Sequence, residues 1–142
     1  MAQAAVRTSP AAEAAIPSRA AIREVLFPSD LSPASDRAFD HARILAERLG
    51  ARLTLYHAVD TAHLSEAREA GDPEVARRSG EAARAHLGRL ASTVAGGSSI
   101  VVEQSNQAAR ALLAQIRATH PDLVGMATHG RDLKFLVIFG LV

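Results

Sequence analysis

The sequence has no cysteine and no tryptophan, and only 4% of its 142 residues are aromatic. Without cysteine, disulfides and thiolate metal sites are excluded. Because 48% of the residues are nonetheless hydrophobic, the core must consist of aliphatic side chains and alanine. This composition suits helices packed on a sheet of Val, Ile and Leu, and the length favours one domain with a sizeable core.

The chain also lacks a strong charge of either sign and any long apolar run. A net charge of +1 argues against electrostatic binding of nucleic acid. Arg77, Arg78 and Arg84 are assigned to a solvated helix face, since no aromatic platform accompanies them. No apolar run reaches the roughly 18 residues of a membrane span. Residues 1–21 are rich in alanine, without the continuous apolar core of a secretory signal, so we expect a flexible tail, a domain over residues 22–142 and a cytoplasmic protein.

Familiar catalytic motifs are missing as well. The sequence contains no G-x-x-x-x-G-K-[ST], no G-x-S-x-G and no H-E-x-x-H. Ser29 and Asp30 are neighbours in the chain, which does not make them part of a triad. His57 ends a strand and is interpreted as a hydrogen-bonded packing residue. His129 has no second ligand at metal-binding spacing. An enzyme is therefore not expected, although a weak ATPase activity stays open.

Strand and helix patterns alternate along the chain. Strands are predicted over residues 23–28, 52–59, 99–103 and 122–127. A first helix follows Ser32 as N-cap and ends at Gly50, with Ala34, Ala38, Ala42, Leu45 and Leu49 at helical spacing. A second runs over residues 74–94, and Asn106 is expected to cap a third whose inner face carries Ala109, Leu112, Leu113 and Ile116. This order predicts a parallel sheet with right-handed crossovers.

The fourth predicted strand runs into the polar segment Thr128-His129-Gly130-Arg131. Glycine permits positive φ and a close approach of the backbone to a ligand. Open α/β sheets build phosphate-binding crevices in this way at their carboxyl edge. Such a glycine also occurs in a plain turn, so this loop alone does not decide between the two.

Several segments together resemble the universal stress protein family. Residues 25–32, Val-Leu-Phe-Pro-Ser-Asp-Leu-Ser, are similar to its first strand and following loop, and residues 53–59 to its second strand. Residues 106–109 stand before the third helix, and residues 122–131 are similar to the fourth strand and glycine loop. The resemblance implies a three-layer sandwich of the adenine nucleotide alpha hydrolase-like, Rossmann-like type, an open parallel α/β sheet in the order 3-2-1-4. The family's fourth helix and fifth strand, which often mediates dimerisation, have no counterpart here.

The resemblance also implies a nucleotide site in the crevice between strands 1 and 4. The implied residues are Pro28, Ser29, Asp30, Ala58, Met126, Ala127, His129, Gly130, Arg131, Gly140 and Leu141. The family pattern Gly-x2-Gly-x9-Gly-[Ser/Thr] keeps its spacing, but Ala127 and Leu141 replace a glycine and a hydroxyl residue. Asp30 would accept from adenine or ribose, although its position before Ser32 also fits a helix cap. Asp60 is not expected to face the crevice.

Three functions follow as alternatives. The first is a stress-response protein that binds ATP, weakly and with only the accompanying Mg²⁺. The second is a member that has lost nucleotide binding and acts through protein–protein contacts, and Ala127, Leu141 and the missing C-terminal elements favour it over the first. The third is a slow ATP hydrolase. The fourth strand is expected to be a sheet edge unless a partner covers it. The apolar segment 135–139 would then fold back over that edge, pair with another subunit or stay loose, and self-association into a homodimer or larger species is the first expectation.

Overall fold

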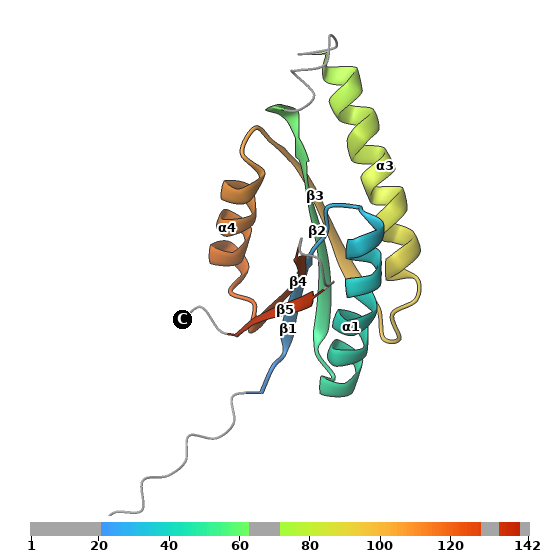
Figure 1. Cartoon of the computed structure of the whole chain (residues 1–142), viewed down its shortest axis with the longest axis vertical. Coiled ribbons are helices and arrows are strands. Elements are labelled where there is room, and N and C mark those ends of the chain that lie inside the picture. The colour runs from blue at the N-terminus through green and yellow to red at the C-terminus, as the bar shows by residue number, and fades with distance from the viewer. Residues whose placement is uncertain (1–20, 63–71, 129–133, 140–142) are drawn as a thin grey trace, which may run out of the picture.

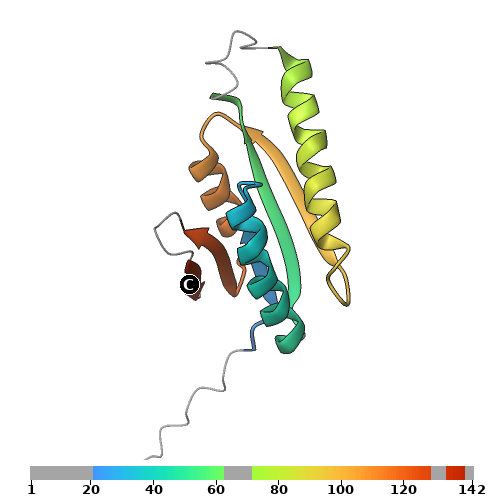
Figure 2. The same ribbon diagram turned by 45° about the vertical axis from the view of Figure 1, so that its right-hand side comes forward.

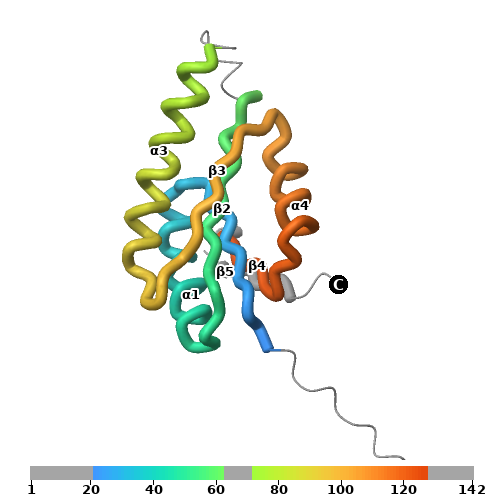
Figure 3. The backbone as a smooth tube through the Cα atoms, turned by 180° about the vertical axis from the view of Figure 1, so that it is seen from behind, coloured from blue at the N-terminus to red at the C-terminus, as the bar shows by residue number. Residues whose placement is uncertain are grey.

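The structure of the chain, a computed structural model, describes residues 21–62, 72–128 and 134–139. Figure 1 shows the elements in chain order, which are β1 (Glu24–Pro28), α1 (Pro33–Leu49), β2 (Arg52–Asp60), α3 (Pro73–Ala91), β3 (Ser98–Ser105), α4 (Ala108–Thr119), β4 (Leu123–Thr128) and β5 (Lys134–Phe139). The strands form one sheet in the order β3-β2-β1-β4-β5. Helices α1 and α3 cover one face of this sheet and α4 covers the other, as Figures 2 and 3 show from two further sides.

The first four strands are parallel to one another, as predicted. β1 pairs with β2 from Glu24↔Arg52 to Pro28↔Tyr56, and β2 pairs with β3 along eight residue pairs. β1 pairs on its other side with β4. The predicted three-layer α/β fold and the order 3-2-1-4 are confirmed. The sheet order reverses between β1 and β4, and this reversal opens a crevice beyond their carboxyl ends.

The expectation that β4 forms an edge of the sheet is wrong. β5 pairs with it antiparallel, in a register that runs from Leu123↔Phe139 to Thr128↔Lys134. An antiparallel partner needs only a short connection, whereas a parallel fifth strand would need a crossover of about a dozen residues or more. Among the three alternatives for this segment, the chain therefore folds back over its own sheet.

Helix α1 begins and ends where its sequence predicts. The Ser32 side chain accepts a hydrogen bond from the Ser35 N–H, Pro33 occupies the first turn, and Gly50 ends the helix with a φ of 63°. The buried face of α1 consists of Ser35, Ala38, Phe39, Ala42 and Ala46. Leu49, predicted on that face, is 43% exposed, because Phe39 and Ala46 occupy the inward positions instead.

The other two helices differ from prediction mainly at their ends. α3 begins after Asp72, whose side chain accepts from the Glu74 N–H, and it ends at Ala91. The cap of α4 is Gln107, without a side-chain hydrogen bond, and not the predicted Asn106. On α4, Leu113 is 47% exposed, although it was expected on the inner face.

Two apolar layers result from the alternation of side chains along β1. Val25 and Phe27 face α1 and α3, and the ring of Phe27 meets the ring of Phe39 edge to face at 5.7 Å. Leu26 points to the opposite face, where it packs with Tyr56 and Val124 beneath α4. In the described ranges, no helix has the length and apolar character needed to cross a membrane.

Candidate functional site

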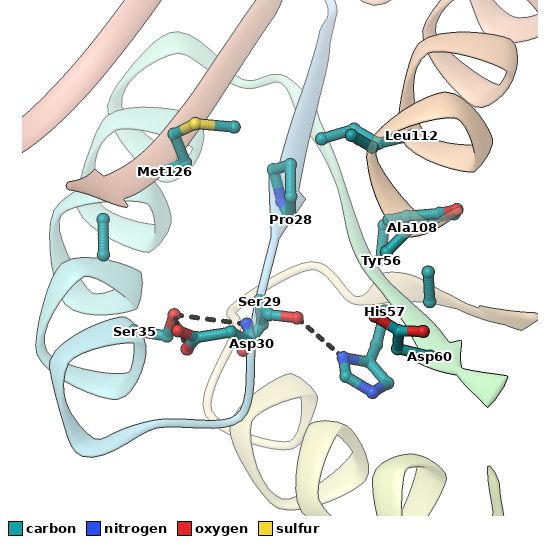
Figure 4. A pocket seen from close by; sticks show the side chains of 13 residues that line it. Pro28, Ser29, Asp30, Ser35, Tyr56, His57, Asp60, Ala108, Leu112 and Met126 are labelled. Atoms are coloured by element: carbon teal, nitrogen blue, oxygen red, sulfur yellow. Dashed lines mark hydrogen bonds between the residues drawn. The ribbon is translucent and has the colours of Figure 1, made fainter. Parts of the chain in front are cut away.

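A pocket of about 450 Å³ lies at the carboxyl ends of β1, β2 and β4, between the first turns of α1 and α4 (Figure 4). Pro28, Ser29 and Asp30 contribute from β1 and the loop that follows it. β2 contributes Tyr56, His57, Ala58 and Asp60. Met126 and Ala127 come from β4, Ser35 from α1, and Ala108, Ala109 and Leu112 from α4. The pocket therefore occupies the crevice where the sheet order reverses, the usual place for a ligand in an open α/β sheet.

Asp30 is tied to the start of α1. Its Oδ1 accepts from the Ser32 N–H at 2.9 Å and from the Ser35 hydroxyl at 2.6 Å. Ser35 is itself 3% exposed, and its hydroxyl also accepts from the Asp30 N–H at 3.3 Å. The expected cap of α1 is thus shared, because Ser32 accepts from the Ser35 N–H while Asp30 binds both serines. These bonds hold the loop and the helix start as one unit.

The same loop contains a left-handed residue. Leu31 has a φ of 64°, a conformation that costs an L-residue of this size energy. Its N–H donates to the buried Ser29 hydroxyl at 3.0 Å, and its side chain packs against the core beneath α1. The turn at Leu31 directs the chain from the end of β1 into α1, so Asp30 comes to lie at the pocket.

Two hydrogen bonds join the end of β2 to the end of the neighbouring strand β1 beside the pocket. The Ser29 N–H donates to the Tyr56 carbonyl at 2.8 Å, and the Nδ1–H of His57 donates to the Ser29 carbonyl, also at 2.8 Å. A carbonyl can only accept, so this contact places the His57 proton on Nδ1. His57 therefore has the hydrogen-bonded, structural position expected for it.

Tyr56 forms the floor of the pocket on the side of α4. It is 2% exposed, and its hydroxyl donates to the Glu103 carboxylate on the neighbouring strand β3. Burial raises the pKa of Tyr56 far above its ordinary value, and the hydrogen bond to Glu103 and the negative charge of Glu103 raise it further. The phenol is therefore a neutral hydrogen-bond donor at any physiological pH.

Asp60 reaches the same pocket, contrary to the expectation from sequence. Tyr56, Ala58 and Asp60 alternate along β2, so they share the face covered by α4. The Oδ1 of Asp60 accepts from the Ala62 N–H at 2.9 Å. Among the described residues that line the pocket, Asp30 and Asp60 are the acidic side chains, and no Lys or Arg is among them.

Pro28, Ser29, Asp30, Ala58, Met126 and Ala127, all predicted at the site, line this one pocket. His129, Gly130, Arg131, Gly140 and Leu141 lie outside the described residues. The site residues predicted from sequence did not include Ser35, Tyr56, Asp60, His57, Ala108, Ala109 and Leu112. Two signals could have found the first three, since Ser35 is the N3 residue after the Ser32 cap, and Tyr56 and Asp60 share the two-residue period of Ala58.

Metal ligands do not gather in the described part of the chain. No group of three or more His, Asp or Glu side chains there could hold a metal ion. The carboxylates of Asp30 and Asp60 supply hydrogen-bond acceptors to a pocket whose described walls are otherwise largely apolar.

The open sheet, covered by helices on both faces, defines a protein of the doubly wound α/β class. The chain belongs to the universal stress protein family, whose family model matches residues 21–142. A search of the curated proteins gave no match. Among solved structures, a universal stress protein in complex with cAMP is 20% identical, with a TM-score of 0.46 over 73% of this chain and 71% of that one. Protein Rv1636 from Mycobacterium tuberculosis H37Rv is also 20% identical, with a TM-score of 0.45 over 78% of this chain and 79% of that one.

Proposed function

We propose that this universal stress protein binds an adenine nucleotide in the pocket between β1 and β4, and that it acts through this binding and not through turnover. The observation that supports the proposal is the pocket of about 450 Å³ at the reversal of the sheet order, with largely apolar walls and two carboxylates. Sites for small ligands commonly combine a concave apolar wall with few polar groups. The hydrogen bonds of the polar lining residues His57 and Ser35 are structural ones: His57 donates its Nδ1–H to the Ser29 carbonyl, and the Ser35 hydroxyl donates to Asp30 at the cap of α1.

The walls fit the parts of a nucleoside. Ala58 on β2 lines the pocket together with Ala108 and Leu112 on α4, and these small and aliphatic side chains offer apolar contact to a flat base. Ser29 and Asp30 stand beside them at the end of β1, where a carboxylate can accept from a ribose hydroxyl. The phosphates would extend past β4 toward Gly130 and Arg131, which stay predicted contacts.

The affinity for ATP is expected to be weak. Ala127 lines the pocket and carries a methyl group where the family pattern has glycine, so the phosphate chain cannot approach the backbone as closely. Leu141 offers no hydroxyl at the last position of that pattern. A nucleotide with a single phosphate, such as cAMP, depends less on these contacts and should lose less affinity than ATP.

Calorimetric titration of the chain with ATP and Mg²⁺, and separately with cAMP, tests the proposal. Asp30→Asn should weaken binding by about 10- to 100-fold, the effect of losing a charged hydrogen-bond partner. Asn keeps an acceptor for Ser32 and Ser35, so the start of α1 should persist. Asp40→Asn is the matched control, because the side chain of Asp40 is 66% exposed on the same helix. Equal affinity in the two variants would remove Asp30 from the site.

Two further outcomes separate this proposal from its alternatives. A chain that binds neither ATP nor cAMP would contradict nucleotide binding and favour a role in protein–protein contacts. Release of phosphate from ATP faster than in a protein-free control, and lost in Asp30→Asn, would favour a slow hydrolase. We expect binding of nucleotide without release of phosphate above that control.

A further inference from the structure

Asp60 is a pocket carboxylate that the proposed function does not yet use. It ends β2 on the face that α4 covers, two residues beyond Ala58. Figure 4 shows Asp60 on the side of the pocket where α4 begins, and Asp30 on the opposite side, next to Ser35 of α1. The two carboxylates therefore lie at different ends of the pocket.

The order of the strands in the sheet indicates which part of a nucleotide would lie near each carboxylate. β2, β1 and β4 lie side by side in the sheet, so the pocket runs from Ala58 past Ser29 to Met126. In the proposed function the phosphates lie beyond β4 and the ribose lies at β1. The base must then lie at the end of β2, against Ala58 and the first turns of α4.

Asp60 is held in a defined orientation at that end. Its Oδ1 accepts from the Ala62 N–H at 2.9 Å, a bond from the side chain to the backbone two residues later that fixes the carboxylate beside the strand end. An ionised carboxylate accepts about four hydrogen bonds and donates none. It favours a base edge that presents an N–H and repels one that presents an oxygen.

We propose that Asp60 is a specificity-determining residue that selects a 6-aminopurine over a 6-oxopurine. The exocyclic amino group of adenine donates to the Asp60 carboxylate. In the same pose, hypoxanthine and guanine place a carbonyl oxygen against the carboxylate, so two acceptors meet there, and their N1–H lies beside this contact and not in it. This inference rests on the proposed nucleotide site, and it adds the group that reads the base.

ATP and inosine triphosphate (ITP) share their ribose and phosphates and differ at C6 and in the proton on N1, so the ratio of their dissociation constants, compared between the wild-type chain and an Asp60 variant, isolates the effect of Asp60. The wild-type chain should bind ATP about 10- to 100-fold more tightly than ITP, the range for one hydrogen bond to a charged group. Asp60→Asn should bring the ratio close to one, because an amide both donates and accepts. The Asn oxygen can still accept from the Ala62 N–H, so the end of β2 should keep its shape.

Asp40→Asn serves as the control and should keep the wild-type ratio. Asp30→Asn should weaken ATP and ITP alike, because Asp30 lies at the ribose. Equal affinity of the wild-type chain for ATP and ITP would overturn the inference and leave the nucleotide site standing. A full preference for ATP in Asp60→Asn, with an unchanged melting temperature, would also overturn it. Failure of the wild-type chain to bind either nucleotide would overturn the inference together with the proposed function.

Discussion

Replacement of Ser35 by alanine isolates the bond between α1 and the loop that carries Asp30. The hydroxyl donates to the Asp30 carboxylate at 2.6 Å, a short distance typical of a charge-assisted hydrogen bond. A hydrogen bond to a charged group contributes about 1.5–3 kcal/mol to stability. Asp30 lies at the surface, so water replaces part of the lost bond, and we expect Ser35→Ala to lower the free energy of unfolding by about 1–2 kcal/mol.

Thermal and urea unfolding followed by circular dichroism measure this loss. For a domain of this size, the expected change lowers the melting temperature by about 3–8 °C. Ser92→Ala is the matched control, because the exposed Ser92 hydroxyl donates only to the Arg89 carbonyl near the end of α3. If Ser35→Ala cost no more than Ser92→Ala, the loop and α1 would not be held together by this bond, and the assignment of Asp30 to the cap would fail.

Three further predictions concern Tyr56, Asp122 and β5. Tyr56 is the sole tyrosine, so the absorbance of tyrosinate reports on it alone. Because the pKa of Tyr56 is raised in the folded state, its hydroxyl should ionise only well above pH ~10, the ordinary value. The free energy of unfolding should therefore fall as the pH rises beyond ~10. Glu103→Gln should remove only part of the rise in the pKa of Tyr56, because burial is the larger cause. Ionisation of Tyr56 at its ordinary pKa in the folded chain would contradict its buried position. Two backbone amides at the start of β1 lower the pKa of Asp122, so this group adds stability above its ordinary pKa that is lost in acid. The difference in the free energy of unfolding between the wild-type chain and Asp122→Asn should therefore shrink as the pH falls. A difference that does not change with pH would refute the role of the Asp122 carboxylate. Ending the chain before Lys134 uncovers the backbone groups of β4 and should increase light scattering with concentration, whereas scattering equal to that of the full chain would show that β5 does not protect this edge.

The fold could be predicted from sequence because its signals are local. Ser32, Pro33 and Gly50 mark the ends of α1 through backbone chemistry that needs no tertiary contact. The alternation of strand and helix patterns then leaves the parallel sheet as the natural arrangement. Helix faces were harder, since Ala34 and Leu49 fit the same helical spacing as the buried Ala38, and only packing against the sheet distinguishes them.

Site residues were predicted where a continuous segment of the chain carries a recognisable motif. They were missed where residues from separate elements meet only through the tertiary fold. Asp30 follows directly from the first strand and its loop. Ala108 and Leu112 come from α4, and no spacing in the sequence reveals that this helix lines the pocket at the end of β2. β5 was foreseen as one of three outcomes, because an apolar segment alone does not specify which strand edge it will pair with.

Asp30 shows why capping and ligand binding are not exclusive alternatives. Its Oδ1 accepts from Ser32 and Ser35, and a carboxylate offers about four acceptor positions in all, so capping through Oδ1 does not by itself exclude a ligand hydroxyl. A nucleotide bound at Asp30 would therefore contact the group that holds the start of α1. Since a ligand that binds only the folded state stabilises it, binding should raise the local stability of this helix start. The helix cap and the proposed ligand site then share Asp30 and its hydrogen bonds to Ser32 and Ser35.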